Sequence, residues 1–454
     1  MSQGQNKITV NKWKNKAIAR GLENKRLRHR IKELHQSRAD WKAKYMAVKQ
    51  QKNQGIFSDE KAFGHQYSLS MVLFLVMLQR YGNMSLRACR ECLVCLSFVG
   101  FSCRIPSHNS IRNWACKCGY FRTHSNPISS SDYVVYVDES IVFGSEKILL
   151  ILGLPVANLP TDSSVSHADM EVLSVGISHS WTGEDIAAEL QKIKDKRGIS
   201  YIVSDEGCNL RSAYKQGNYT HIEDCTHILS NIMKRFYEKD TRFEAFRSFV
   251  GKTRQSFYLS KEKSAFLPPC LRGKLRFVNI FSCVAWAKNQ LAAWDKLPLE
   301  LQENLSFLRE NEAFIDELSA QHFIFTEVCR ILKNQGFSQR SRTEITALLS
   351  GFGKNEKVKE MVVEVIGYLD KLNKKCEALS LSHCLCSSDI IESFFGKFKH
   401  KINPNNKNKL SEFVVTIANF GKEFEAEEVK KALENVKIKD LKNFKKNNKS
   451  GQKK

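Results

Sequence analysis

Acidic side chains follow directly after two apolar, strand-like segments of this 454-residue chain. The first segment, YVVYV at 133–137, leads into Asp138, and the second, ISYIVS at 199–204, leads into Asp205. A carboxylate retained at the end of a buried strand is costly unless it has a partner, so it commonly binds a cation or another charged group. An isolated acid at such a place can also cap a helix or close a turn. The surrounding elements must decide between these roles.

Two further groups of polar residues follow in the chain. Asp224 and His227 stand three apart after a short apolar segment, where Asp224 could cap a helix and His227 could lie on its surface. In SSDIIESFFGKFKHK at 387–401, helical spacing puts Glu392 and Lys399 on one face, two turns apart. A metal-facing glutamate with lysines beyond it suits a helix that lies along a phosphate backbone.

The residues around these groups are patterned as alternating strands and helices. Strand-like apolar runs and helix-like amphipathic runs alternate after the first strand, with Thr182 as a predicted cap and Gly198 as a predicted stop. The predicted strands are 133–138, 148–155, 170–180, 199–207 and 219–222, and the predicted helices are 182–198, 208–216 and a segment that begins at His227. The predicted order is therefore βββαβαβα, with acids at the ends of strands one and four.

This order resembles the ribonuclease-H-like fold of DDE transposases and retroviral integrases. In that fold strands one and four lie side by side, so the resemblance implies that Asp138 and Asp205 meet at one edge of the site. Glu392 and Lys399 match the Glu, six residues, Lys pattern of many insertion-sequence transposases. The Tyr and Arg that precede the glutamate in one large group of these enzymes are absent.

The segment from Asp224 to His227 fits a second pattern, the Asp-or-Cys, two residues, His motif of Mutator-type transposases. The resemblance implies that His227 orients Asp224 or the scissile phosphate. Taken together, the sequence is similar to bacterial insertion-sequence DDE transposases. The implied fold class is α/β: a ribonuclease-H-like mixed sheet with a large helical insertion, preceded by an α-helical DNA-binding region.

The resemblance also implies a reaction and a metal. Two Mg²⁺ ions about 4 Å apart, for which Mn²⁺ substitutes, would neutralise the phosphate and activate the nucleophile. Asp138 would bridge both ions, Asp205 would bind one and Glu392 the other, with His227 and Lys399 as further catalytic residues. Hydrolysis at the element's end frees a 3′-OH, which then attacks target DNA. The assignment leaves open that a neighbouring acid serves instead, and these neighbours are Glu139, Glu206 and Asp389.

The composition favours a polyanionic partner. Lys and Arg number 71 against 48 Asp and Glu, which gives a formal net charge of +23 and a pI near 9.4. No stretch of about 20 apolar residues predicts a membrane span, and no signal peptide is recognisable after Met1. We therefore expect double-stranded DNA as partner, no membrane association, and a bacterial cytoplasmic, nucleoid-associated protein.

Fourteen cysteines without an export signal argue for reduced thiols. The cysteines at 89, 92, 95, 103, 116 and 118 could form a structural zinc site. The alternative is that those within LRACRECLVCL are small apolar residues on one helical face.

The N-terminal segments predict helical modules. Residues 1–60 form a basic arm in which Leu27, Ile31 and Leu34 begin a three-four spacing, enough for a short coiled coil that forms a homodimer or higher oligomer on DNA. A basic helix that packs on its own chain is equally compatible.

Residues 61–125 resemble a helix-turn-helix, whose second helix would enter the major groove. The alternative is a small helical bundle. The expected DNA contacts are His108, Asn109, Arg112 and Asn113 on this helix and Lys397 and Lys401 further along the chain.

The remaining chain completes the predicted domain organisation. The catalytic domain comprises 130–236 and 381–435 and is interrupted by a helical insertion at 237–380. A basic, disordered tail follows at 436–454. Two other functions remain open, a ribonuclease-H-like nuclease or resolvase of another kind, and a non-catalytic DNA-binding protein derived from a transposase.

Overall fold

The structure is a computed structural model of the full chain. It describes residues 20–21, 23–42, 57, 60–99, 104–125, 130–143, 146–271, 276–353, 355–402 and 410–450. The chain separates into two compact units, one made of 1–56 and 239–319, the other of 57–238 and 320–454. All candidate catalytic residues lie in the second unit.

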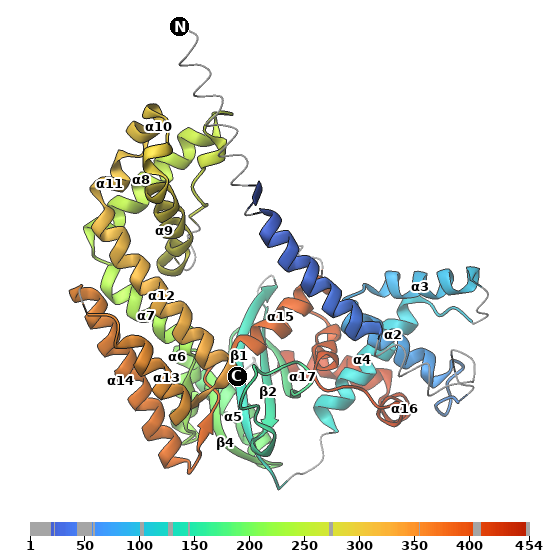
Figure 1. The fold of residues 1–454 in the computed structure, drawn as a ribbon. Helices are drawn as coiled ribbons and strands as arrows, with labels where there is room; N and C mark the ends of the chain where they lie inside the picture. The colour runs from blue at the N-terminus through green and yellow to red at the C-terminus, as the bar shows by residue number, and fades with distance from the viewer. Residues whose placement is uncertain are drawn as a thin grey trace. The chain divides into compact units, whose positions relative to one another are not determined.

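A five-stranded mixed sheet forms the centre of the second unit (Figure 1). Its strands are β1 (Asp132–Phe143), β2 (Glu146–Pro155), β3 (Glu171–Ser178), β4 (Gly198–Ser204) and β5 (His221–Glu223). The order across the sheet is β3-β2-β1-β4-β5. Strands β1, β2 and β3 pair antiparallel, whereas β4 runs parallel to both β1 and β5. The predicted α/β class and the predicted order of strands are confirmed.

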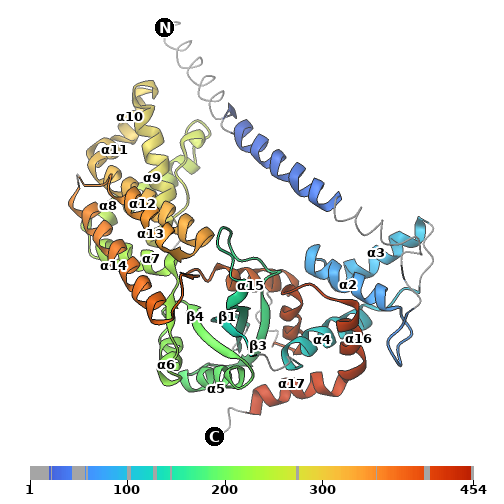
Figure 2. The ribbon, with the colours of Figure 1, turned by 60° about the horizontal axis from the view of Figure 1, so that its bottom comes forward.

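Strand alternation divides the sheet into two apolar faces. Val135 and Val137 of β1 point to a face covered by α5 (Gly183–Lys194) and α6 (Cys208–Gln216). A capping box at Thr182 starts α5 as predicted. The other face carries the even-numbered side chains of β1 and contacts α15 (Asp389–Lys401), which Figure 2 shows on the opposite side of the strands from α5 and α6.

Helices before and after the sheet share one core. These helices are α2 (Leu69–Tyr81), α3 (Leu86–Phe98), α4 (His108–His124) and α16 (Ala426–Asn435), and the 3₁₀ segment η4 (Glu412–Phe420) packs against α4. Leu75, Trp114 and Val429 belong to the same buried cluster. At Gly119 a Cβ atom would stand 2.1 Å from the Val415 carbonyl oxygen, so α4 and η4 approach as closely as only glycine permits. The predicted module at 61–125 is therefore completed by the C-terminal segment.

The C-terminal segment differs from the expected disordered tail. Helix α17 spans Ile438–Ser450, and its Leu441 and Phe444 are buried. The Phe444 ring meets the Tyr120 and His124 rings of α4 edge-on, at 6.2 and 5.9 Å between centroids. These two apolar side chains, three positions apart, form a buried stripe on one face of the helix. The prediction of disorder was based on the overall composition, which is mostly Lys and Asn, and overlooked this stripe.

The segment between α7 (Cys225–Tyr237) and α15 is helical, as predicted. Its helices are α8 (Thr241–Tyr258), α9 (Arg276–Ala292), α10 (Leu299–Asn304), α11 (Ser306–Glu310), α12 (Glu312–Gln335), α13 (Gln339–Leu349) and α14 (Glu356–Ala378). A two-stranded sheet of β6 (Phe337–Ser338) and β7 (His383–Cys384) joins them.

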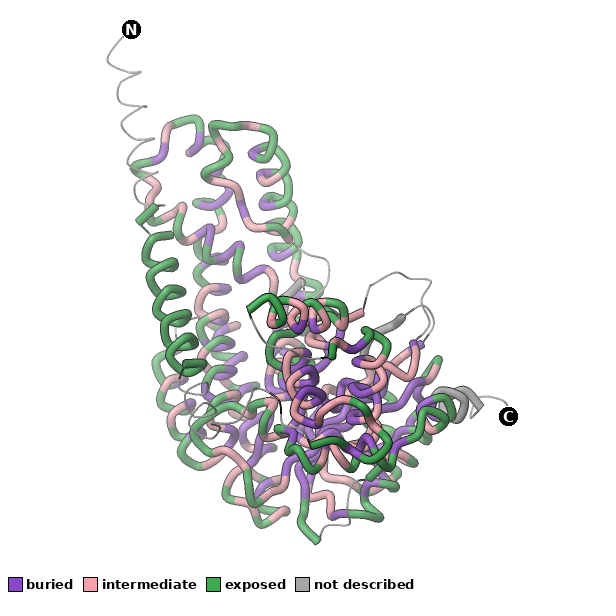
Figure 3. The backbone as a smooth tube through the Cα atoms, turned by 90° about the vertical axis from the view of Figure 1, so that its right-hand side faces the viewer, coloured by how far each residue is buried: buried purple, intermediate pink, exposed green. Residues whose placement is uncertain are grey.

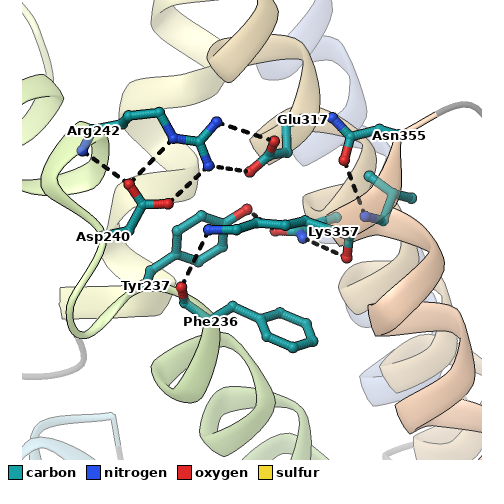
Figure 4. Close-up of polar contacts among 9 residues, drawn as sticks. Phe236, Tyr237, Asp240, Arg242, Glu317, Asn355 and Lys357 are labelled. Carbon is teal, nitrogen blue, oxygen red and sulfur yellow. Dashed lines mark hydrogen bonds and ion pairs between the residues drawn. The ribbon is translucent and has the colours of Figure 1, made fainter.

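The division into units falls inside this segment, because only 239–319 belongs to the first unit. Helix α14 belongs to the second unit, since its Tyr368 hydroxyl donates to the Glu223 carbonyl oxygen at 2.9 Å. In the same unit, the Tyr237 hydroxyl donates to Gln321 Oε1 at 2.7 Å, and Lys357 Nζ donates to the carbonyl of the residue before Tyr237 (Figure 4). The insertion predicted at 237–380 is therefore not one separate body.

Within the first unit, an ionic cluster lies at the N-terminus of α8, in which the Glu317 carboxylate is buried and the Arg242 side chain is exposed. Asp240 caps the helix by accepting from the Arg242 backbone N–H at 2.9 Å, and the Arg242 guanidinium reaches both Asp240 and Glu317 of α12 (Figure 4). Phe246 and Phe314 pack edge-on behind this cluster, 6.2 Å apart.

Residues 20–42, apart from 22, are helical and exposed (Figure 3). The apolar side chains of the predicted coiled-coil stripe, Leu27, Ile31, Leu34 and Trp41, are 47–56% exposed in the single chain. Most of the predicted arm at 1–60 lies outside the described residues. Among those that are described, no helix is both long and apolar enough to cross a membrane.

Candidate active site

Asp138 lies on β1, and Asp205 directly follows the neighbouring parallel strand β4. The pairing of β1 with β4 ends at Tyr136 opposite Val203, and each aspartate stands two residues further along its own strand direction. Because side chains alternate, both aspartates are on the face that Tyr136 and Val203 share. Strand β1 does not end at Asp138 as expected but continues to Phe143 as the partner of β2.

The charges of three other predicted catalytic residues act on Asp138. Burial, and then the negative charges of Asp205 and Glu392, raise the pKa of Asp138 to about 7, while His227 acts in the opposite direction. These groups come from β1, the residue after β4, α15 and α7. Asp205 and Glu392 are about 190 residues apart in the sequence, and in the fold both act electrostatically on Asp138.

The neighbouring acids are held elsewhere. Glu139 points to the opposite face of β1 and lies 3.4 Å from Lys147 Nζ. Glu206 accepts a hydrogen bond of 2.9 Å from an asparagine side chain of α7. Asp389 pairs with Lys333 of α12 at 2.6 Å. Asp205 and Glu392, rather than Glu206 and Asp389, are the acids whose charges raise the pKa of Asp138.

Asp224 is buried and uses both carboxylate oxygens within the protein. Its Oδ1 caps α7 by accepting from the His227 backbone N–H at 2.8 Å. Its Oδ2 accepts from the Ser388 backbone N–H at 2.6 Å and from the Ser388 hydroxyl at 3.0 Å. Burial, and then the adjacent Cys225, raise the pKa of Asp224 to about 6, although the donated hydrogen bonds oppose this. The link to Ser388 was not visible in the sequence.

The three lysines of α15 have different surroundings. Lys399 is exposed two turns beyond Glu392, as predicted. Burial, and then the positive charge of Arg80, lower the pKa of Lys397. Lys401 differs from the expected phosphate contact, because its Nζ donates to the Gln79 carbonyl at 2.5 Å and burial lowers its pKa to about 8.

Helix α4, the predicted recognition helix, is largely covered. His108 and Asn109 at its start and His124 at its end are exposed, while Asn113 is partly buried. Arg112 pairs with Glu412 of η4 at 2.8 Å. The covering segments η4, α16 and α17 lie about 300 residues further along the chain, so the local pattern of a helix-turn-helix could not reveal them.

A groove of about 640 Å³ opens between the N-terminal helices, α15 and η4. His108, Arg112 and Lys401, three of the predicted DNA contacts, line it together with Arg87, which the sequence analysis did not single out. The groove therefore gathers basic side chains from two segments that are far apart in the sequence.

The cysteine-rich helix α3 gives no sign of zinc. Cys89 is buried in the apolar core, Cys92 is partly buried and Cys95 is exposed, whereas Cys103 lies outside the described residues. Across the described parts of the chain, no group of three or more His, Cys, Asp or Glu side chains is arranged to hold a metal ion.

The candidate catalytic acids nevertheless fit a hard cation by their chemistry. Asp138, Asp205 and Glu392 offer only oxygen ligands, which Mg²⁺ prefers. Burial, and then the charges of Asp205 and Glu392, raise the pKa of Asp138, and a bound cation would oppose this shift. Glu392 itself is exposed on the first turn of α15.

Comparison with known proteins adds no relative to this picture. No protein-family model matches the chain, and no curated protein is significantly similar to it in sequence.

Proposed function

We propose that this protein is a DDE transposase that binds the ends of a DNA element and catalyses metal-dependent strand cleavage and strand transfer. The observation that carries the proposal is that the charges of Asp205 and Glu392 both act on Asp138, which lies just beyond the end of the β1–β4 pairing. These are the same three acids that the sequence pattern predicts.

The topology supports a ribonuclease-H-like fold. The sheet order β3-β2-β1-β4-β5, with three antiparallel strands followed by two parallel ones, is the order expected for that fold. In such sheets the first and fourth strands are adjacent, and their ends carry the first two acids. The third acid comes from a later helix on the face of β1 opposite α5, which is where α15 lies.

The proposed chemistry assigns each residue a task. Asp138, Asp205 and Glu392 would hold Mg²⁺, and ions bound there supply charge for the scissile phosphate and lower the pKa of the attacking water. His227 adds a polar group beside Asp138. Lys399, exposed two turns along α15, would contact the phosphate backbone of the DNA.

The net charge supports DNA as a partner, and the exposed apolar stripe of the N-terminal helix supports a second copy of the chain. The net charge of +23 favours DNA, and the groove lined by Arg87, His108 and Arg112 supplies a basic surface close to α15. The apolar stripe of residues 27–41, exposed in the single chain, would pair two copies as a coiled coil on the DNA.

The test is a cleavage assay with the purified full-length protein. Linear duplexes that carry the two sequences flanking the gene in its source DNA are incubated with Mg²⁺ or Mn²⁺, and nicks at the ends and joined products are resolved on sequencing gels. Branched junctions of the same sequence are run alongside.

Metal-dependent nicking at the ends, followed by joining through the freed 3′-OH, supports the transposase. Cleavage of branched junctions alone would instead identify a resolvase. Tight DNA binding without cleavage in either metal would leave a non-catalytic DNA-binding protein.

A further inference from the structure

The segment Leu385–Ser388, which we call the strap, leads from β7 into α15 and is fixed to the central sheet. Its first residue donates its backbone N–H to the Tyr201 hydroxyl of β4 at 2.9 Å. The Cys386 carbonyl accepts from the Cys225 backbone N–H, at the start of α7, at 2.8 Å. The strap therefore crosses the face of the sheet that carries the two aspartates.

The last attachment of the strap is the carboxylate of Asp224. Ser388 offers this carboxylate two donors, and the N–H of His227 offers a third, so both oxygens are engaged. Asp224 is 1% exposed, so each of these bonds lies out of competition with water. Ser388 directly precedes α15, and Glu392 follows one turn later.

An ordinary helix cap does not require this arrangement. A capping aspartate needs only one oxygen, and asparagine serves equally well. Here the second oxygen binds a residue 164 positions away in the chain. An asparagine would direct its NH₂ group at one of the two backbone N–H donors, so only a carboxylate satisfies both sides.

We infer that Asp224 is a positioning residue, which sets the placement of Glu392 and His227 relative to Asp138 by joining the start of α7 to the start of α15. The inference rests on the proposed function for its catalytic consequence, but not for its structural content. Replacing a residue that orients the residues of a metal site, without binding the metal itself, commonly changes metal affinity or activity 10- to 100-fold.

The test compares three variants with the wild-type full-length protein. Asp224→Asn preserves shape and removes one acceptor. Ser388→Ala removes a single donor and leaves the backbone bond. Asp389→Asn is the matched control, since it breaks the exposed ion pair with Lys333 on the same turn of α15, and such a pair contributes little.

Two measurements are made on each variant. Hydrogen exchange followed by mass spectrometry reports the strap and the first turn of α15, where Asp224→Asn should exchange at least about tenfold faster while α5 and α6 keep their protection. Cleavage as a function of Mg²⁺ concentration should show a half-saturation raised about tenfold with DNA affinity unchanged. Mn²⁺ should restore part of the activity, because Mg²⁺ demands the stricter geometry. Ser388→Ala should change the exchange rate and the Mg²⁺ half-saturation in the same direction, but less than Asp224→Asn does. Asp389→Asn should change neither.

Unchanged exchange at α15 in Asp224→Asn overturns the inference, and so does a wild-type Mg²⁺ dependence. Uniform loss of protection in Asp224→Asn reduces that variant to a folding defect, and an unshifted Mg²⁺ dependence in Ser388→Ala then overturns the inference. If the wild-type protein never cleaves DNA, the proposed function is wrong. The inference about Asp224 is still tested, because the exchange data report whether Asp224 holds the strap.

Discussion

Asp138 lies within β1 and Asp205 directly follows β4, each two residues beyond the pair that Tyr136 and Val203 form across the two parallel strands. The pairing of β1 with β2 fixes the backbone of Asp138, whereas the turn after β4 holds Asp205, whose Oδ1 accepts from the Gly207 backbone N–H at 3.0 Å. A side chain on a strand is positioned more precisely than one on a loop.

The first prediction concerns the identity of the three acids. Asp138→Asn, Asp205→Asn and Glu392→Gln should each lower Mg²⁺-dependent cleavage by at least about 10³-fold, because each removes a charged metal ligand, while DNA affinity in EDTA stays within about threefold of wild type. Cleavage rates and fluorescence-anisotropy binding curves measure the two properties.

The controls for this prediction are the neighbouring acids. Glu139→Gln and Asp389→Asn should retain cleavage within several-fold, because Lys147 and Lys333 hold these side chains away from Asp138. Loss of cleavage in Asp389→Asn together with survival in Glu392→Gln would reassign the third ligand.

The second prediction is a pH-dependent stability caused by Asp138. Its pKa is about 7 in the folded protein, above its value in the unfolded chain, so its favourable contribution is complete below about pH 4 and is lost as the pH rises towards 7. Asp138→Asn should therefore stabilise the metal-free protein by about 1–3 kcal/mol at pH 8 and leave it unchanged at pH 4.

Urea unfolding at the two pH values in EDTA measures this difference. Addition of Mg²⁺ at pH 8 should raise the stability of the wild type and not that of Asp138→Asn, because the cation replaces the proton. An equal effect of Asp138→Asn at pH 4 and pH 8 would contradict the assigned cause.

The third prediction separates basic residues that face DNA from one that does not. Arg87→Ala and Lys399→Ala should each weaken DNA binding about 3- to 10-fold and lower the slope of log affinity against log salt by about 1. Both side chains are exposed. Lys401→Met should leave the slope unchanged and lower the melting temperature, since Lys401 binds the Gln79 carbonyl. If the slope of log affinity against log salt also falls in Lys401→Met, Lys401 contacts DNA after all.

The fourth prediction tests the exposed stripe of the N-terminal helix. Replacing Ile31 and Leu34 together by Asp should convert a dimeric or larger assembly into a monomer, because two charges then fall in the apolar seam. Light scattering coupled to size exclusion, at several protein concentrations, gives the mass. Lys32→Ala, on the same turn, should keep the assembly, and a monomeric wild type would dismiss the coiled coil.

The fifth prediction concerns the C-terminal helix. Phe444→Ala should reduce the free energy of unfolding by about 2–4 kcal/mol, because the ring is buried against Tyr120 and His124. Lys442→Ala, exposed on the same helix, should have no measurable effect. Equal stability of the two variants would mean that α17 does not pack on α4.

The local features of this fold could be predicted from the sequence, and the long-range ones could not. Alternation in YVVYVD and helical spacing after Thr182 depend on neighbours in the chain, so the order of strands and helices was predictable. The acids at Asp138 and Asp205 were predictable for the same reason, since they follow apolar strands.

Contacts between distant segments could not be predicted from local patterns. Helix α4 has the pattern of a recognition helix, but η4 and α16 cover it, and Arg112 binds Glu412 across 300 residues. The tail was expected to be disordered because most of its residues are Lys and Asn. Its two buried apolar residues pack on α4, and this distant surface could not be predicted from the sequence. The sequence predicts that Asp224 caps a helix, but not its hydrogen bond to the distant Ser388.

The discontinuous site also has a consequence during protein synthesis. Asp205, the later of the two aspartates, leaves the ribosome about 190 residues before Glu392, a delay of roughly 10–40 s at elongation rates of roughly 5–20 residues per second. During that interval β5 has no α14 beside it, and the nascent sheet carries two aspartates without their third partner. Under the proposed function, a nascent chain that has not yet released Glu392 lacks one of the three acids and is expected not to cut DNA.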